Sequence, residues 1–231
     1  MRPNDESEIR ALPLFRDMAQ DGFENLMRGA YVQTFPPQVD LIVEGDPCDF
    51  FHIVTEGSVE LFAAWNGRET TMATMRPVAT FILAATIKDA PYLMSARTVE
   101  KSRIVLIPSS DVRLAFANDL AFAHAIVGEL ATCYRSVVKN SKDLKLRNSI
   151  ERLANYLLRQ YHSEEGDSFD LRIEKRRLAS YLGMTPENLS RSIKALQPYG
   201  VEVDGMSVTL RNIPDLENLA KPTPLIDDKS A

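Results

Sequence analysis

The spacing of hydrophobic residues changes twice along the chain. Residues 7–29 carry apolar side chains at mixed helical spacing, which predicts short amphipathic helices. From about Tyr31 to Pro108, short β-branched and aromatic runs alternate with turn residues. Asn66-Gly67 is the strongest hairpin signal, because both central positions of a type I′ turn require positive φ. Regularly spaced short strands of this kind predict an antiparallel β-roll.

After Ser110-Asp111 the pattern becomes helical and continues to about residue 146. Its uncharged residues alternate steps of four and three, which is the spacing of a coiled-coil seam. One amide within such a seam fixes the register of two helices, so the pattern favours a dimer over a buried core helix. The predicted seam consists of Ile126, Leu130, Cys133, Val137, Asn140 and Leu144.

A further helix is predicted from "SIERLANYLLRQY", residues 149–161, which carries its apolar residues on one face. A polar stretch, "HSEEGDSFD", follows and is predicted to be a loop. We place a domain boundary near residues 145–148, where the seam ends.

The stretch "LASYLGMTPENLSRSIKALQPYG" contains two short helical patterns that meet at Gly183-Met184-Thr185. Gly183 can adopt the left-handed conformation that ends a helix. Thr185 is a good N-cap residue, and Pro186 suits the first helical turn. These features predict a helix-turn-helix, and "VEVDGMSVTLRN" after it predicts the two strands of a wing.

The second helix of this motif carries polar residues away from its apolar side. They are types that reach base edges and phosphates: Glu187, Ser190, Arg191 and Lys194. A basic cluster precedes the motif, formed by Arg172, Lys175, Arg176 and Arg177. The alternative is that Glu187 and Arg191 form only a solvated pair worth a few tenths of a kcal/mol. The whole arrangement, with its cap, joint, basic helix and wing, favours DNA binding.

Composition is that of a soluble globular protein, with 45% hydrophobic and 26% charged residues in 231. The net charge of −5 argues against a generally polycationic binder but does not exclude a local basic face. No apolar run approaches the roughly 20 residues of a membrane span, and the N-terminal stretch is too polar for a signal peptide. We therefore expect a cytoplasmic protein with no membrane partner.

Catalytic machinery is not visible in the sequence. The 2 cysteines, Cys48 and Cys133, are too few for a four-thiolate iron–sulfur or zinc site. There is no Ser/His/Asp arrangement, no metal-spaced cluster and no phosphate-binding glycine loop. We predict that the protein is not an enzyme and holds no metal.

Taken together, these motifs resemble those of the Crp/Fnr transcription regulators over nearly the whole chain. In the first half, "VEGDPCDFFHIVTEGSVELF" resembles the family's strand–Gly–strand signature, with Gly45 and Gly57 at the turns. In the second half, "RRLASYLGMTPENLSRSIKALQPYG" resembles the Fnr branch and its Glu-x-x-Ser-Arg pattern.

The resemblance implies an α+β fold built from a jelly-roll sensor domain like a cyclic-nucleotide-binding domain, a long dimerisation helix and a C-terminal winged helix-turn-helix domain. We expect the sensor domain with its N-terminal helices at residues 1–110 and the dimerisation helix and hinge at 111–146. The DNA-binding domain is then expected at 147–212 and a tail at 213–231. Whether the tail packs on the domain or frays is left open.

The resemblance also implies how the motif reads DNA. Arg191 is expected to bind guanine O6 and N7, and Glu187 to accept from cytosine N4, pairings that base-edge geometry independently favours. Ser190 stands where the Crp branch has glycine, and Pro186 where that branch has an arginine, so a TTGA-type half-site is implied over a TGTGA-type one. Phosphate contacts are expected at Lys175 and Arg176.

Cyclic-nucleotide-binding members of the family hold the ribose with a glutamate and the cyclic phosphate with an arginine and a serine. A gap-free alignment places Ala84 at the glutamate position and Met94 at the arginine position, with Ser95 retained. Val137 and Val138 stand where the long helix would supply a threonine and a serine. The phosphate would lack its charge-assisted partner, so cyclic AMP is not expected.

Two possibilities remain for control. The pocket is filled by its own side chains, or it holds an apolar or planar ligand, heme being one candidate. His52 and His124 are the histidines considered as axial ligands, although a lone histidine is more often structural. An oxygen-sensing iron–sulfur cluster is excluded by the cysteine count. Cys133 on the seam could respond to oxidation, but a buried thiol would be inert.

We therefore predict a homodimeric, sequence-specific transcription regulator that reads a TTGA-N-TCAA-like palindrome. A hinge at Leu144–Asn148 is expected to switch the dimer between two arrangements, and a ligand can drive this only through differential affinity. Activation through RNA polymerase is expected, with the loop His162–Ser168 as a candidate contact. The alternative is a cyclic-nucleotide-binding regulatory subunit of an enzyme.

Overall fold

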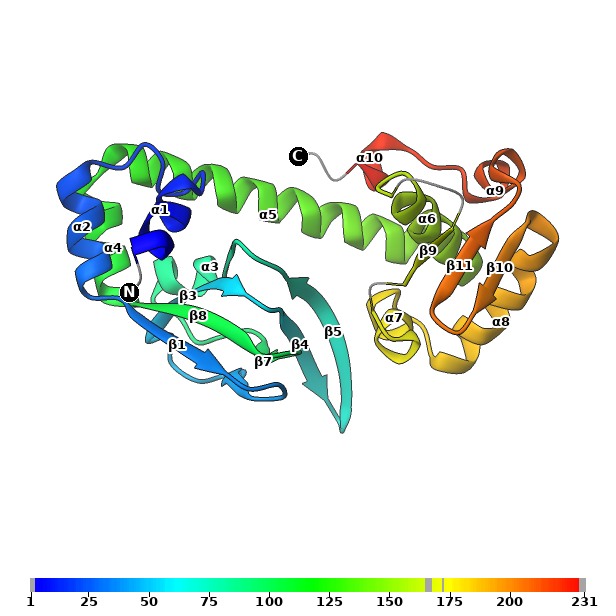
Figure 1. The fold of residues 1–231 in the computed structure, drawn as a ribbon, viewed down its shortest axis with the longest axis horizontal. Coiled ribbons are helices and arrows are strands. Elements are labelled where there is room, and N and C mark those ends of the chain that lie inside the picture. The colour runs from blue at the N-terminus through cyan, green and yellow to red at the C-terminus, as the bar shows by residue number, and fades with distance from the viewer. Residues whose placement is uncertain (1–2, 165–167, 172, 229–231) are drawn as a thin grey trace. The chain divides into compact units, whose positions relative to one another are not determined.

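The computed structural model describes residues 3–164, 168–171 and 173–228. The chain folds into two compact units, residues 1–132 and residues 133–231, which are coloured from blue to green and from green to red in Figure 1. Arg172 and positions 165–167 of the loop considered for RNA polymerase contact lie outside the described residues.

The first unit is built on two four-stranded antiparallel sheets. One has the strand order β1 (Tyr31–Phe35), β8 (Ser102–Pro108), β3 (Phe50–Glu56) and β6 (Ala79–Phe81). The other has the order β2 (Asp40–Ile42), β7 (Ser95–Thr98), β4 (Val59–Trp65) and β5 (Arg68–Met75). The predicted antiparallel roll is confirmed.

The β4–β5 hairpin turns where the sequence predicts it. Trp65 pairs with Arg68, and the two residues between them, Asn66 and Gly67, have φ of 50° and 73°. These are the positive values that a type I′ turn requires. Gly57, in the turn between β3 and β4, has φ of 80°, and a Cβ there would lie 2.4 Å from the carbonyl oxygen of Lys101.

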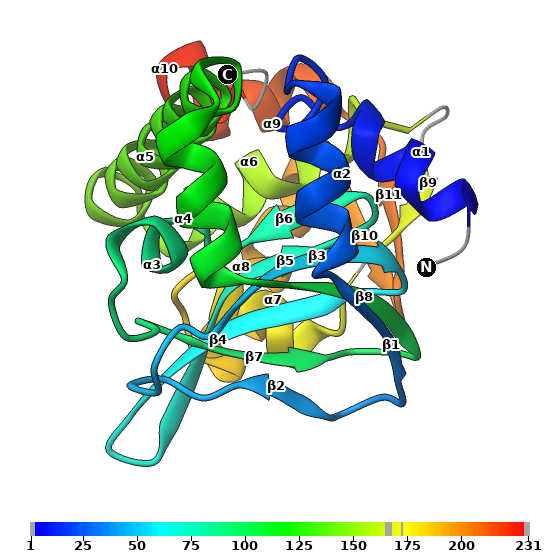
Figure 2. The ribbon, with the colours of Figure 1, turned by 90° about the vertical axis from the view of Figure 1, so that its left-hand side faces the viewer.

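Two hydrophobic clusters stabilise this unit. One fills the interior between the sheets, with Val54 and Ile104 from one sheet and Leu61 and Ala96 from the other. The second lies on the outer face of the β1-β8-β3-β6 sheet, where helices cover it (Figure 2). These helices are α1 (Pro3–Ala11), α2 (Gln20–Arg28) and α4 (Ser109–Asn118), while α3 (Leu83–Lys88) follows β6.

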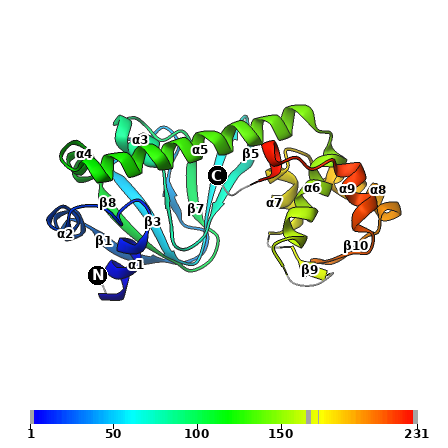
Figure 3. The same cartoon turned by 90° about the horizontal axis from the view of Figure 1, so that it is seen from above.

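The helical region after Ser110 is broken, which corrects the expectation of one continuous helix. α4 ends at Asn118 and α5 (Leu120–Leu146) begins at Leu120, with a bend of 114° between them. Asp119 at the break accepts hydrogen bonds from the backbone N–H groups of Phe122 (2.9 Å) and Ala19 (2.8 Å). These bonds, the one from Phe122 foremost, lower the pKa of Asp119. After the break α5 runs as one unbroken helix (Figure 3).

Among the described helices, none alone has the length and apolarity to cross a membrane, and α4 with α5 meets that test only as a bent pair, by length and composition.

The residues of the predicted seam on α5 do not share one environment in the structure. Ile126 is fully buried in the first unit's own core, and Leu130 packs against the same cluster. Farther along α5, the predicted seam residues Cys133, Val137, Asn140 and Leu144 are exposed, and so are Val127 and Tyr134, which are 58% and 70% exposed. Ile126 therefore belongs to the intramolecular core, and the later seam positions are open in the single chain.

The second unit begins with the end of α5 and α6 (Ser149–Tyr161). α6 starts in a capping box: the Asn148 side chain accepts from the N–H groups of Ile150 and Glu151, both at 3.0 Å, and Glu151 accepts from the Asn148 N–H at 2.9 Å. α7 (Lys175–Tyr181), α8 (Pro186–Leu196) and the short 3-10 helix η1 (Gln197–Tyr199) follow.

A small antiparallel sheet completes the unit, in the order β10 (Val201–Asp204), β11 (Ser207–Leu210), β9 (Ser168–Asp170). β10 and β11 are the predicted wing. β9 lies within the stretch predicted to be a loop, which is a correction. Phe169 and Leu171 are both buried in the unit's core, and their alternation was the signal for a strand.

The segment after the wing packs on the domain through residue 228, which settles the question left open for those residues. α9 (Ile213–Ala220) buries Leu216 and Ala220 in the core. The Asn155 side chain of α6 donates to the Ala220 carbonyl at 2.7 Å, and a last short helix, α10 (Pro224–Asp227), follows.

Candidate nucleic-acid interface

The joint between α7 and α8 needs a glycine for two reasons. Gly183 has φ of +61°, a left-handed conformation that ends α7. A Cβ at this position would also lie 2.6 Å from Cδ2 of Leu144 on α5. The N–H groups of Gly183 and Met184 donate to the carbonyls of Ser180 and Ala179, both at 2.9 Å, which closes the turn.

α8 begins abruptly because its first turn is capped. Thr185 is extended, with φ of −77° and ψ of 158°, and its hydroxyl accepts from the Asn188 N–H at 3.2 Å. Pro186 occupies the first helical turn, where no N–H is needed. The cap fixes where the helix starts and therefore which side chains its first two turns present.

The two faces of α8 differ completely in burial. Leu189, Ser192 and Leu196 are buried against the domain core. The opposite face presents the four side chains expected to contact DNA, all of them exposed: Glu187, Ser190, Arg191 and Lys194. The structure thus brings the predicted reading residues of α8 together on one open face.

The exposed face of α8 carries an acidic and a basic side chain, Glu187 and Arg191, one helical turn apart. The pKa of Glu187 is lowered, first by its own backbone N–H, then by the Thr185 hydroxyl, with a smaller effect from the charge of Arg191. Ser190 donates its hydroxyl to the Pro186 carbonyl at 3.0 Å, so its oxygen remains able to accept. Acidic and basic groups are therefore both available on this face near neutral pH.

The helix before the joint adds positive charge. Arg176 is exposed and Lys175 half-buried in the first turn of α7. Beyond α8, the β10–β11 turn has Gly205 at φ of +57°, and Arg211 pairs with Glu202 across the hairpin through two bonds of 2.7 and 2.9 Å. Lysine and arginine are side chains that commonly contact phosphates, and the Glu202–Arg211 pair joins β10 to the residue after β11.

Arg152 of α6 supports the joint and was missed in the sequence. Its Nε donates to the Leu182 carbonyl at 2.8 Å and its Nη2 to the Gly183 carbonyl at 3.4 Å. Its Nη1 donates to the Arg147 carbonyl at 2.6 Å, just beyond the end of α5. Arg152 lies on the polar side of α6 in the sequence pattern, so nothing local indicated that it would be buried.

The residues considered for an effector pocket are not gathered within one unit. Ala84 is exposed on α3, Met94 packs against the roll interior, and the Ser95 hydroxyl accepts from the Glu44 N–H at 3.0 Å. Val137 and Val138 are exposed on the part of α5 that belongs to the second unit. None of the three roll positions supplies a cation for a cyclic phosphate, so they do not fit that ligand.

β7 also carries an arginine, Arg97, but its guanidinium already pairs with two carboxylates. Arg97 contacts Glu60 at 3.0 Å and Glu69 at 2.8 Å, and its guanidinium lies 4.2 Å from the centre of the Phe62 ring. Two carboxylates leave little positive charge for an added anion.

The histidines and cysteines considered for sensing differ in burial. His52 is buried and stacks on Phe81, with ring centres 5.1 Å apart, and burial lowers its pKa to about 4. His124 is exposed on α5. Cys48 is buried and Cys133 exposed. Within the described ranges, no group of three or more His, Cys, Asp or Glu side chains could hold a metal ion.

Two family models match the chain, one in each of its two units. Residues 32–119 match the cyclic nucleotide-binding domain, and residues 151–219 match the Crp-like helix-turn-helix domain. Comparison with curated protein sequences finds no match.

Solved structures share the fold at low identity. FixK2 from Bradyrhizobium japonicum is 22% identical with a TM-score of 0.70, covering 84% of this chain and 98% of its own. The c-di-GMP responsive global regulator CLP of Xanthomonas campestris is 18% identical with a TM-score of 0.67, covering 84% and 100%. Catabolite activator protein from Thermus thermophilus is 24% identical with a TM-score of 0.52, covering 91% and 99%.

At these identities the structures establish the fold, and the two matched domains carry the assignment. A roll of the cyclic-nucleotide-binding type followed by a Crp-like helix-turn-helix, with an exposed polar face on α8, is the arrangement of one group of regulators. The chain belongs to the Crp/Fnr family of DNA-binding transcription regulators.

Proposed function

We propose that the protein is a homodimer that reads a palindrome of TTGA-type half-sites with α8. The observation that carries this is the exposed row Glu187, Ser190, Arg191 and Lys194, placed on one face by the Thr185 cap. An α-helix fits the major groove, where its outward side chains meet base edges.

Each side chain in the row has a chemical role in this reading. Arg191 donates two bonds to guanine O6 and N7, and the ionised Glu187 accepts from cytosine N4. Ser190 reads a neighbouring base with its hydroxyl. Lys194, with Lys175 and Arg176 on α7, neutralises phosphates and positions the helix without reading sequence.

The partner of α5 in this proposal is a second copy of the same helix. Val127, Leu130, Tyr134, Val137, Ser141 and Leu144 alternate steps of three and four, the spacing of a coiled-coil seam. Val127, Tyr134 and Val137 are each more than half exposed in the single chain. A two-fold dimer places two copies of α8 roughly 34 Å apart, so half-site centres about one helical turn apart are expected.

Control does not depend on cyclic AMP in this proposal, because Met94 and Ala84 replace the groups that would hold it. The roll packs Met94 against its own interior, which supports a regulator without a small effector in that place. An apolar ligand, heme included, remains the second candidate because Val137 and Val138 leave an apolar surface on α5.

The regulator is proposed to act in the cytoplasm as an activator through contact with RNA polymerase. His162, with its side chain 59% exposed, begins the loop suggested for that contact. The alternative, a cyclic-nucleotide-binding subunit of an enzyme, is not favoured, because it gives no role to the Crp-like helix-turn-helix domain.

Fluorescence anisotropy tests the proposal directly. Purified protein is titrated, with nothing added, into a duplex bearing TTGA and TCAA half-sites and into a scrambled duplex at matched salt. We expect tighter binding to the palindrome, lost in Arg191→Ala and kept in Arg28→Ala, a matched change at an exposed arginine of α2.

Weak and equal binding to both duplexes would contradict the proposed half-site or the active state of the free dimer. Selection from a random duplex library, with and without apolar ligands, then distinguishes the two. A sequence selected without ligand corrects the half-site, and one selected only with ligand identifies an effector-dependent dimer.

A further inference from the structure

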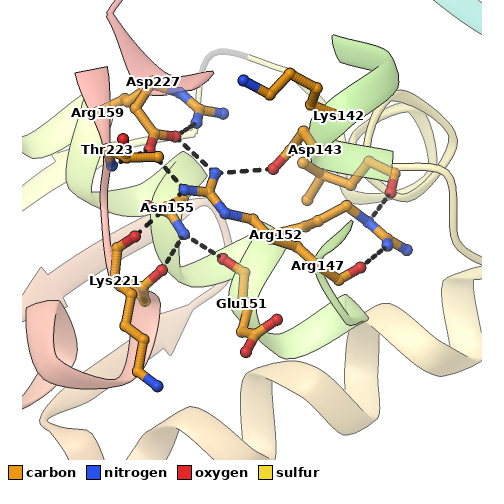
Figure 4. A network of polar contacts seen from close by, with 12 residues as sticks. Lys142, Asp143, Arg147, Glu151, Arg152, Asn155, Arg159, Lys221, Thr223 and Asp227 are labelled. Atoms are coloured by element: carbon orange, nitrogen blue, oxygen red, sulfur yellow. Dashed lines mark hydrogen bonds and ion pairs between the residues drawn. The ribbon is translucent and has the colours of Figure 1, made fainter. Parts of the chain in front are cut away.

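α10 is tied to the hinge between α5 and α6 by one carboxylate (Figure 4). Asp227 accepts two bonds from Arg147, to Oδ1 from Nη1 at 2.8 Å and to Oδ2 from Nη2 at 2.6 Å. It accepts another from Arg159 of α6 at 2.8 Å and one from the Thr223 N–H at 2.8 Å. The carboxylate thus joins three segments of the second unit.

Arg147 lies in the short connection between two helices. α5 ends at Leu146 and α6 begins at Ser149, so only Arg147 and Asn148 join them. Arg147 also bonds Asp143 of α5 at 2.9 Å, and the side chains of Arg147, Asp143 and Asp227 are only 7%, 12% and 11% exposed. Paired charges so shielded from water hold their geometry tightly.

Two lysines of α5 strengthen the same attachment. Lys139 donates to the carbonyl of Asp228, and Lys142 to that of Leu225 at 3.4 Å. The last two turns of α5 are therefore held along the segment that contains α10, as well as at Arg147.

The attachment continues to the helix-turn-helix. The Arg147 carbonyl accepts from Arg152, and the same guanidinium holds the carbonyls of Leu182 and Gly183 at the joint before α8. Leu144 of α5 lies against Gly183 as well. A contiguous set of contacts thus links Asp227 to the start of the reading helix.

We propose that Asp227 is a positioning residue for DNA binding: by fixing Arg147 it holds the reading helix α8 at a set angle to the end of the dimerisation helix. The proposal rests on the proposed dimeric reading of a palindrome. The proposal predicts that loss of Asp227 affects a palindrome more than a single half-site. One subunit needs only its own α8 to bind a half-site, whereas a palindrome needs both copies of α8 at the right separation.

The test compares a full palindrome with a single half-site. The duplexes come from selection with the unmodified protein, so the result does not depend on the TTGA sequence. Asp227→Asn keeps the shape and removes the charge, and Glu217→Gln on α9 removes a charge from the same unit at a half-exposed side chain. Asp227→Glu is the conservative rescue.

We expect Asp227→Asn to weaken binding to the palindrome by about tenfold or more, since loss of fixed geometry lowers the effective concentration of the second reading helix. Half-site affinity should stay within about twofold, because α8 itself is unchanged. The variant should also tolerate palindromes with one or two added central base pairs better than the unmodified protein. Glu217→Gln should change none of these, and Asp227→Glu should restore part of the loss.

An equal loss on palindrome and half-site would overturn the proposal, because it would mean that Asp227 only stabilises the domain. Unchanged binding of Asp227→Asn to the palindrome and to the half-site would also overturn the proposal. An electron-spin distance measurement without DNA gives an independent answer, using a label at Gln197→Cys in a Cys133→Ser background. We expect one narrow distance between protomers that broadens in Asp227→Asn, and an unchanged distribution would overturn the proposal.

Failure of the proposed function has a different signature. If the unmodified protein selects no sequence from the library and shows no distance between protomers, the dimeric reading is wrong and the role of Asp227 falls with it. If the unmodified protein passes both tests and Asp227→Asn behaves identically, only the role of Asp227 is wrong.

Discussion

The two units use their charged side chains in different ways. In the roll, Arg97 on β7 bonds Glu60 on β4 and Glu69 on β5, so the guanidinium holds three neighbouring strands together. In the second unit, α8 turns Glu187 and Arg191 outward, where water surrounds them. Arg97 is thus paired within the roll, whereas Glu187 and Arg191 remain available to a partner.

This difference teaches where specificity can arise in the chain. A guanidinium that already bonds two carboxylates has little charge left for a cyclic phosphate, whereas an exposed arginine can bond guanine directly. Substitutions in the roll should therefore change stability with little effect on base preference. Substitutions on α8 should do the reverse.

The largest expected effect comes from Arg97→Met. It leaves Glu60, whose side chain is 2% exposed, without its cationic partner, and the free energy of unfolding of the roll should fall by about 3 kcal/mol. Calorimetry of the full chain would measure this. The double variant Glu60→Gln/Arg97→Met removes both charges and should lose less; an equal or larger loss would show that the ion pair is not what the roll depends on.

Acidification should weaken the roll through His52. Burial lowers its pKa from 6.5 to about 4, so between these values the unfolded chain binds a proton that the folded chain does not. The free energy of unfolding should therefore fall as the pH drops from about 6.5 to about 4, by at most about 3 kcal/mol from this one group.

The measurement is the unfolding transition of the roll at several pH values, compared with His52→Phe, which keeps a ring beside Phe81. The variant should lose less stability over that pH range. Identical pH dependence in the two proteins would remove His52 as the cause.

A smaller effect, confined to base preference, is expected from Glu187→Ala. Loss of the carboxylate should reduce discrimination at the cytosine position by roughly 1–3 kcal/mol, because no acceptor then selects the cytosine amino group. Binding to duplexes with each base at that position would measure this. Unfolding of the roll should be unaffected, and a change in roll stability instead of base preference would break the contrast between the units.

The smallest expected effect is that of Lys194→Ala. A phosphate contact adds affinity without reading sequence, so binding should weaken about equally on specific and scrambled duplexes. The slope of log K against the logarithm of the salt concentration should also become shallower by about one, the value for one phosphate contact. Anisotropy titrations over a range of salt would show it. Loss restricted to the specific duplex would instead assign Lys194 to base reading.

Much of the second unit could be predicted because its signals are local. A capping threonine, a proline after it and apolar residues on one face define α8 within a few neighbours. In the first unit, the Asn66-Gly67 hairpin likewise follows from the φ requirements of two neighbouring residues. The strand β9 was overlooked because three residues in a polar stretch give too short an alternation to stand out from a loop.

The seam on α5 shows how local patterns become ambiguous. Ile126 and Val127 are neighbours in sequence, but they point about 100° apart around a helix, and both fit a seam by spacing. The structure buries Ile126 against the roll and leaves Val127 exposed. Packing against the β1-β8-β3-β6 sheet chose between them, and that sheet forms from distant parts of the chain.

The sequence by itself determined the types of the two domains, the joint between α7 and α8 and the row of side chains on α8, because each depends on residues close together in the chain. Only the tertiary structure decided the break at Asp119, which bonds an N–H 100 residues away, and the tie between Arg147 and Asp227, 80 residues apart. The physical reason is that a buried ion pair or a side-chain cap needs a partner at bonding distance, and separation along the sequence does not reveal which distant residue folding brings there.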